Sequence, residues 1–123
     1  MRLLIVEDEV RLADTLRQLL HRQGYTADVC YDGVSGLDNA MTGIYDLVVL
    51  DEVIDAYNLG TIQKEQLLEM MDKRPEGTEL VITGHQYGMD ISALTDRADY
   101  VTKFVKEKHP FDLGMPCRKG IEE

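Results

Sequence analysis

The chain has 123 residues, of which 44% are hydrophobic and 29% charged, and its formal net charge is −10. A chain of this length and composition folds as one globular domain around a single buried core. The excess of acidic residues argues against direct binding to nucleic acid, whose phosphates would be repelled, and no apolar run is long enough to cross a bilayer.

The first part of the chain alternates short apolar runs with helical patterns. Residues 3–6 are an apolar run closed by acids, which is typical of a central parallel strand buried on both faces. The leucines between residues 12 and 20 recur at helical spacing, and residues 26–31 predict a second strand. Asp32 is a helix N-cap, although the glycines that follow it lower the helix propensity. Residues 47–50 predict a third strand, which again ends in an acid.

The alternation continues after the third strand. Residues 61–71 predict a helix, residues 80–82 a fourth strand and residues 90–98 a short helix. A fifth strand is expected over residues 99–104. The remaining residues, 105–123, hold prolines and glycines and do not form the pattern of a final amphipathic helix, so one face of the sheet is expected to be poorly covered.

This succession predicts a three-layer, flavodoxin-like α/β domain over residues 1–123, with five parallel strands in the order 2-1-3-4-5 and an irregular tail in place of the final helix. Ligands bind at the carboxyl ends of the strands in such sheets. The other order compatible with the pattern is that of a P-loop sheet, with its first strand between the fourth and fifth. The flavodoxin-like order is favoured because it brings Lys103 toward the acids. An uncovered apolar face would favour a homodimer or a tail folded over it.

Side chains suited to phosphoryl chemistry follow the predicted strands: Glu7 and Asp8, Asp51, Thr83 and Lys103. Three carboxylates in close contact repel one another unless a cation neutralises them, and oxygen ligands suit Mg²⁺. Asp51 would then be a nucleophile toward a phosphoryl group. Thr83 would donate its hydroxyl to a phosphoryl oxygen, and Lys103 would neutralise another. The alternative is that these acids merely end strands where the chain meets solvent.

The segments Leu-Ile-Val-Glu-Asp-Glu at 4–9 and Tyr-Asp-Leu-Val-Val-Leu-Asp at 45–51 carry a family resemblance. Through them, residues 1–51 resemble the start of a bacterial response-regulator receiver domain. The resemblance implies that Glu7 and Asp8 bind Mg²⁺. It also implies that Asp51 accepts phosphate from the phosphohistidine of a histidine kinase or from a small phosphodonor.

Further roles follow from the same resemblance. The backbone carbonyl of Val53 would complete the metal ligands, and Thr83 matches the hydroxyl residue of the family. In the segment 98–103, Lys103 matches the family's lysine and Tyr100 its switching aromatic. Apart from Mg²⁺, no cofactor is implied.

The receiver pattern is not kept after Asp51. The segment 52–60 has no proline, whereas the family has a proline-and-glycine loop there, and Phe104 replaces the proline that usually follows the lysine. Residues 51–123 instead resemble the carboxyl half of a P-loop ATP:corrinoid adenosyltransferase, the enzyme that adenosylates cobalamin. The segments that carry this second resemblance are 50–53, 74–84, 108–112 and 118–122.

In the second family, Asp51 and Glu52 would be the Walker B pair, which delivers a carboxylate to nucleotide-bound Mg²⁺. Catalysis there also needs a phosphate loop whose backbone N–H groups cradle ATP. The chain contains no glycine-rich segment followed by Lys-Ser or Lys-Thr. We therefore expect no enzymatic activity, and residual nucleotide or corrinoid binding is the least favoured function.

Both resemblances meet at Asp51, which divides the domain into a receiver-like half, 1–51, and a corrinoid-adenosyltransferase-like half, 52–123. The leading hypothesis is an engineered, recombinant chimera of the two, a hybrid scaffold that keeps the acidic Mg²⁺ pocket and has no native role. The alternative is a functional receiver phosphorylated on Asp51 in two-component signalling. The parent families are cytoplasmic, and the spacing of Cys30 and Cys117 does not match a metal site, which agrees with a reducing compartment.

Overall fold

A four-stranded parallel sheet forms the centre of the computed structural model, which describes residues 1–120, and its strand order is β2-β1-β3-β4. The strands are β1 (Arg2–Val6), β2 (Thr26–Cys30), β3 (Leu47–Leu50) and β4 (Glu79–Ile82). Val6 pairs with Leu50, and Leu50 pairs with Ile82. The residues that follow β1, β3 and β4 are therefore gathered at one edge of the sheet.

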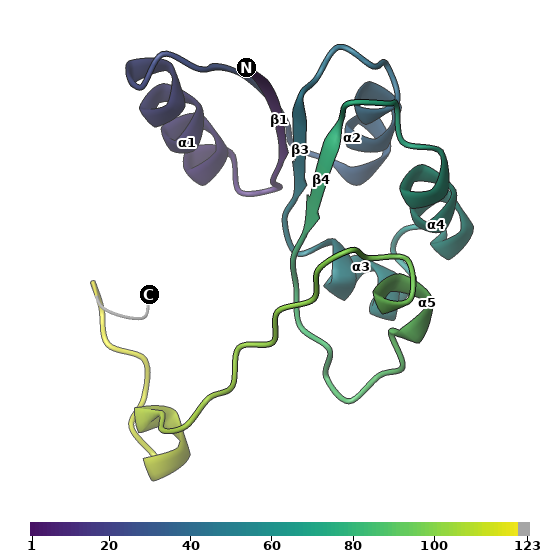
Figure 1. The fold of residues 1–123 in the computed structure, drawn as a ribbon. Coiled ribbons are helices and arrows are strands. Elements are labelled where there is room, and N and C mark those ends of the chain that lie inside the picture. The colour runs from purple at the N-terminus through teal and green to yellow at the C-terminus, as the bar shows by residue number, and fades with distance from the viewer. Residues whose placement is uncertain (121–123) are drawn as a thin grey trace.

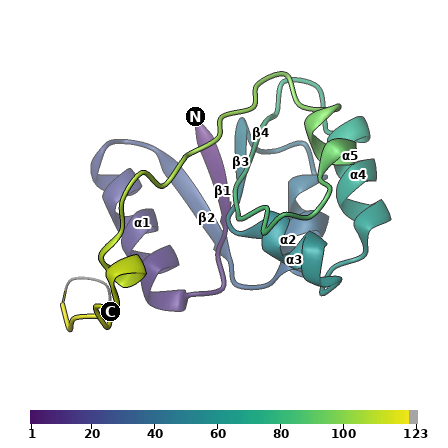
Figure 2. The same cartoon turned by 90° about the horizontal axis from the view of Figure 1, so that it is seen from below.

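Helices lie on both sides of this sheet (Figures 1 and 2). They are α1 (Val10–Arg22), α2 (Gly33–Ala40), α3 (Val53–Leu59), α4 (Lys64–Lys73), α5 (Ser92–Thr95) and a 3₁₀ helix, η1 (Pro110–Leu113). In Figure 2, α1 covers one face of the sheet, while α2 and α4 lie beyond the other face. The predicted flavodoxin-like, three-layer α/β fold is confirmed. Of the described helices, none is long and apolar enough to span a membrane.

The core is built from the strands that the apolar runs predicted. Leu4, Val48 and Leu50 are almost completely buried, as expected for central parallel strands covered on both faces. Leu67 of α4 and Leu94 of α5 are buried in the same cluster. The carboxyl ends of β1 and β3 are thus held on a closely packed base.

The two glycines that weaken α2 as an isolated helix have a packing role at one position. A Cβ atom at Gly36 would lie 2.6 Å from both γ-carbons of Val6 in β1. Only a residue without a side chain lets α2 approach the strand this closely. The low helix propensity is offset by tertiary packing.

The predicted fifth strand over residues 99–104 is wrong in this structure. Those residues form no strand, and within residues 1–120 no backbone hydrogen bond joins them to β4. Tyr100 and Phe104 are 94% and 93% exposed. A parallel strand needs cover on both faces, and residues 105–120 form no long helix to cover the face on the α1 side.

The residues after the predicted fifth strand form the irregular tail that the sequence predicted, as far as the structure describes them. Between residues 105 and 120, the short helix η1 is the regular element. The tail runs away from the layers of the domain (Figure 1). Residues 121–123 lie outside the described residues.

We predict that Gly36→Ala destabilises the protein, although alanine is the better helix former. In an open helix the change would stabilise by about 1 kcal/mol, whereas crowding against Val6 costs about 1–3 kcal/mol. Unfolding in urea measures the free energy difference. The double variant Val6→Ala, Gly36→Ala should recover part of the loss, and strictly additive effects would contradict the contact.

Candidate functional site

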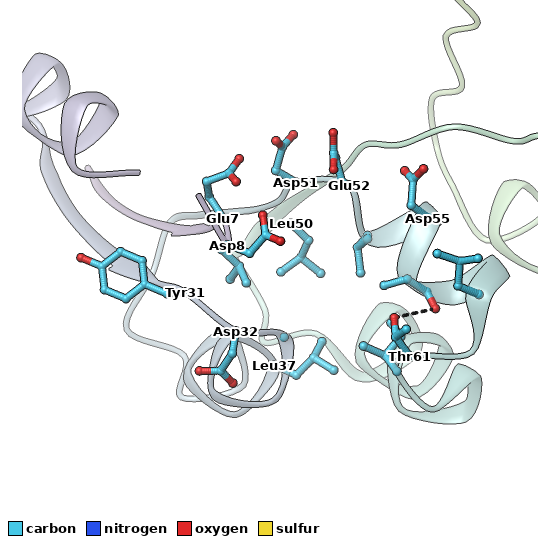
Figure 3. A pocket seen from close by; sticks show the side chains of 16 residues that line it. Glu7, Asp8, Tyr31, Asp32, Leu37, Leu50, Asp51, Glu52, Asp55 and Thr61 are labelled. Atoms are coloured by element: carbon cyan, nitrogen blue, oxygen red, sulfur yellow. Dashed lines mark hydrogen bonds between the residues drawn. The ribbon is translucent and has the colours of Figure 1, made fainter. Parts of the chain in front are cut away.

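A cavity of about 440 Å³ opens at the carboxyl ends of β1 and β3. Its acidic lining residues are Glu7, Asp8, Asp32, Asp51, Glu52 and Asp55. Figure 3 shows Glu7, Asp51 and Glu52 next to one another along its rim. The predicted gathering of acids at this edge of the sheet is therefore present.

Glu7 is the most buried of these acids, at only 7% exposed. Its Oε1 accepts the Glu9 backbone N–H at 2.8 Å, and its carboxyl group interacts with those of Asp51 and Asp8. Burial and the hydrogen bond with Asp51 raise the pKa of Glu7 to about 7. Protonation of Glu7 lowers the repulsion between neighbouring carboxyl groups, and a bound cation would have the same effect.

Thr83, the residue directly after β4, is hydrogen-bonded to Asp51, the predicted phosphoryl acceptor. Its hydroxyl donates to Asp51 Oδ1 at 2.6 Å and accepts the Glu52 backbone N–H at 3.0 Å. Its own backbone N–H donates to the Leu50 carbonyl at 3.2 Å, and its carbonyl accepts the Ile54 N–H at 3.1 Å. The hydroxyl therefore bridges the end of β3 and the start of α3.

The chain after Asp51 turns directly into a helix. Glu52 has φ 50° and ψ 19°, a left-handed conformation that is costly for a residue other than glycine, and Val53 begins α3. Val53 lines the cavity, but helical geometry directs its carbonyl toward the N–H four residues on. The missing proline-and-glycine loop explains this early helix, and the carbonyl would have to leave the helix to reach a cation.

Two predicted site residues lie elsewhere. Lys103 and Tyr100 are exposed and are not among the residues that line the cavity. Without a fifth strand, nothing holds Lys103 level with Thr83. The structure thus brings together Glu7, Asp8, Asp51 and Thr83, and it does not bring Lys103 or Tyr100 to them.

One polar contact next to the cavity, between Asp55 and His85, was not foreseen from the sequence. The backbone N–H of His85 donates to Asp55 Oδ2 at 2.9 Å, and its ring Nδ1 lies 3.2 Å from Asp55 Oδ1. Burial alone would raise the pKa of Asp55, but the hydrogen bonds from His85 outweigh it and hold that pKa below its usual value.

Gly84 lets this turn lie against α3. Its φ is +143°, and a Cβ atom there would stand 2.5 Å from Asp55 Oδ2. The only sequence signal for the contact was this glycine directly after Thr83, because Asp55 falls in a helix that the sequence did not predict. The turn and the start of α3 are thus packed as one unit beside Asp51.

The carboxyl oxygens at this site are suitable ligands for a divalent cation, but the side chains are not positioned around one. Among residues 1–120, no group of three or more histidine, cysteine, aspartate or glutamate side chains is already placed to hold a metal ion. However, Glu7, Asp8 and Asp51 line one cavity and the carboxyl group of Glu7 interacts with the other two, so a divalent cation would compete with the proton of Glu7 for their oxygens. These three residues would hold Mg²⁺, which prefers such oxygen ligands.

The sequence is similar to two kinds of known protein. Residues 22–122 match the family described as ATP:corrinoid adenosyltransferase BtuR/CobO/CobP. The transcriptional regulatory protein DltR of Streptococcus agalactiae is 51% identical over 51 residues, which are 42% of this chain and 23% of that protein. The response regulator ArlR of Staphylococcus aureus is 33% identical over 116 residues, which are 90% of this chain and 47% of that protein. The chain spans less than half the length of these curated relatives.

Solved structures agree with the receiver likeness. The response regulator TrrA of Thermotoga maritima, in complex with Mg²⁺ and BeF, is 27% identical with a TM-score of 0.50, covering 84% of this chain and 86% of that one. A chain of the complex between histidine kinase ThkA and TrrA is 25% identical with a TM-score of 0.55, covering 92% and 94%. Both family resemblances expected from the sequence are therefore found among known proteins. The engineered chimera is not confirmed, since the matches to the two kinds of protein overlap along most of the chain, and the division at Asp51 stays a hypothesis.

We predict that the metal-free protein loses stability as the pH rises from about 4.5 to about 7. Glu7 keeps its proton in the folded state over this window and has lost it in the unfolded state, so the contribution is complete below the unfolded pKa and disappears above the folded one. The loss is at most about 3 kcal/mol. Urea unfolding at several pH values, with chelator present, measures it.

The control for this pH dependence is Glu7→Gln, which imitates the protonated side chain. Its stability relative to the parent should rise across the same pH window. Parallel pH profiles for the two proteins would contradict the assignment to Glu7.

Proposed function

We propose that this chain, which belongs to the ATP:corrinoid adenosyltransferase family through residues 22–122, accepts a phosphoryl group on Asp51. The proposal is drawn from its receiver-domain relatives and its receiver-like fold. The observation that supports this best is the 2.6 Å hydrogen bond from the Thr83 hydroxyl to Asp51 in a cavity shared with Glu7 and Asp8. The donor would be a histidine kinase or a small phosphodonor, in the cytoplasm.

The reaction uses a carboxylate oxygen of Asp51 as the nucleophile. A P–O bond to Asp51 forms as the bond from phosphorus to the donor breaks, and the donor leaves with the electron pair of that bond. The Thr83 hydroxyl orients the carboxylate before transfer and is within reach of a phosphoryl oxygen afterwards.

Glu7 would lose its proton when the site binds a cation, because a proton and a cation compete for the same carboxyl oxygens and the pKa of Glu7 is raised to about 7. Mg²⁺, when bound by Glu7, Asp8 and Asp51, would supply the positive charge that the phosphoryl oxygens need. The ThkA–TrrA complex and the Mg²⁺–BeF complex of TrrA support the choice of donor and metal by analogy.

The family match over residues 22–122 does not lead us to propose adenosyl transfer. The chain carries no phosphate loop, so the Asp51-Glu52 pair has no backbone cradle that would hold the triphosphate of ATP beside it. In this proposal, what the chain shares with the adenosyltransferase family is a stable segment of the sheet and the acid after β3, and not the enzymatic reaction.

A folded scaffold without phosphoryl transfer is the second candidate. Two observations favour it: Val53 is held in α3, and Lys103 is exposed and away from the cavity lining. Both would lower the affinity for metal and phosphoryl groups relative to a complete receiver site. The two candidates differ in whether Asp51 can be phosphorylated at all.

We predict that acetyl phosphate with Mg²⁺ adds one phosphoryl group to the chain and that chelator prevents it. Asp51→Asn removes the nucleophile and should abolish the adduct. Intact-protein mass spectrometry measures the added mass. Asp38→Asn, on the outer part of α2, is the matched control and should still react. An unmodified parent chain would favour the scaffold.

Thr83 should matter more than Lys103 for this reaction. Loss of one preorganised donor costs on the order of 10² in rate, so we predict a slowing of that size for Thr83→Ala and little change for Lys103→Ala. Initial phosphorylation rates with a small donor measure both. Thr83→Ser keeps the hydroxyl and should retain most of the rate. Equal slowing by the two alanine variants would contradict this ranking.

A further inference from the structure

The turn that follows β4 begins with Thr83, which the sheet supports on one side. The backbone N–H of Thr83 donates to the Leu50 carbonyl of β3 at 3.2 Å. β4 is the last strand in the order of the sheet, and the next residue, Gly84, has a φ of +143°. The ladder therefore ends at Thr83, and the residues after it depend on other contacts for their position.

Two side chains on neighbouring turns of α3 supply these contacts. Asp55 Oδ2 accepts the His85 backbone N–H at 2.9 Å, and Asp55 Oδ1 lies 3.2 Å from the ring Nδ1 of His85. Asn58, three residues further along the helix, donates from Nδ2 to the carbonyls of His85 and Gln86, at 3.0 and 3.3 Å. The carboxylate of Asp55 thus binds a backbone donor of the turn, and the amide of Asn58 binds its backbone acceptors.

The turn and α3 are also closely packed. A Cβ atom at Gly84 would lie 2.8 Å from the Cβ of Ile54 and 3.1 Å from the backbone nitrogen of Asp55. The Ile54 N–H donates to the Thr83 carbonyl at 3.1 Å. The side chain of Asp55 is only 16% exposed. A shift of the turn would therefore be costly, because it would leave a largely buried carboxylate with fewer hydrogen-bond donors.

The position of this turn decides where the Thr83 hydroxyl points. Threonine is β-branched and has few side-chain rotamers, so its hydroxyl follows the backbone. The hydroxyl donates to Asp51 Oδ1 at 2.6 Å and accepts the Glu52 N–H at 3.0 Å. In Figure 3, Asp55 stands beyond Glu52 on the same rim of the cavity as Asp51. A misplacement of about 1 Å in an active site can slow a reaction by on the order of 10²-fold.

We propose that Asp55 and Asn58 are positioning residues for phosphoryl acceptance. They hold the turn after β4 on α3, and the turn keeps the Thr83 hydroxyl on Asp51. This role rests on the proposed function. It separates Asp55 from the other acids of the cavity, because both of its oxygens have partners in the turn, whereas the acids that follow β1 and β3 would hold the cation.

Amide hydrogen exchange of the full chain, followed by NMR, tests the hold on Thr83 without any reaction. The Glu52 N–H reports on the Thr83 hydroxyl that accepts it, so Asp55→Ala should speed its exchange roughly tenfold. Asn58→Ala should also speed it, and the matched control Asp38→Ala, at an exposed position of α2, should leave it unchanged. Unchanged exchange at Glu52 in both α3 variants would overturn the proposal. So would an equal acceleration in the strands, which would indicate a loss of global stability.

Initial rates of phosphorylation from acetyl phosphate with Mg²⁺ test the consequence. Asp55→Ala should slow the reaction roughly tenfold in the parent chain but hardly at all in a Thr83→Ala chain, because the hydroxyl that Asp55 positions is then absent. Asp55→Asn keeps an oxygen for the His85 N–H and should retain most of the rate. The Mg²⁺ concentration that gives half the maximal rate should stay the same in Asp55→Ala, whereas loss of a cation ligand would raise it.

Equal slowing by Asp55→Ala in the two backgrounds, or a raised Mg²⁺ requirement, would overturn the proposal. A parent chain that takes up no phosphoryl group would instead contradict the proposed function. In that case the exchange rate of the Glu52 N–H would still decide whether Asp55 and Asn58 hold Thr83 in place.

Discussion

The crowding of carboxyl groups at one edge of the sheet is the constraint on which the site depends. The parallel ladder imposes it: the Glu7 N–H donates to the Cys30 carbonyl and the Asp51 N–H to the Val6 carbonyl, both at 3.0 Å. The backbone hydrogen bonds therefore fix the position of the Cα atom of each acid, whether its side chain is charged or not. Burial then leaves two ways to relieve the repulsion, a shared proton or a cation. The raised pKa of Glu7 favours the proton, and the proposed Mg²⁺ site is the second way.

The sheet and the meeting of Glu7, Asp8 and Asp51 were predictable from the sequence, because apolar runs that end in acids specify buried parallel strands and the polar edge that they share. The fifth strand was not, since its formation depends on cover from a helix that residues 105–120 do not form. Helix α3 was missed because the residue before it, Glu52, has a left-handed backbone conformation, and the sequence there carries no helix start signal. The Asp55–His85 contact follows from that helix and was hidden with it.

The two family likenesses are compatible in physical terms. Both families place an acid after an apolar strand, and both use it beside a metal, so the same residues from Leu47 to Asp51 satisfy either pattern. A fold can carry one chemistry or another according to the loops around it. Here the polar groups around Asp51 are Glu7, Asp8 and Thr83, and a phosphate loop is lacking, so the local chemistry follows the receiver more than the adenosyltransferase.

The early completion of the sheet affects how the chain can be made and how it can vary. All four strands have been synthesised by Ile82, and among residues 1–120 the one buried hydrophobic residue beyond that point is Leu94. The ladder can therefore form on the ribosome before the last part of the chain has emerged. Since residues 99–120 bury little of the core, their sequence can drift at small cost to the folding of everything before them.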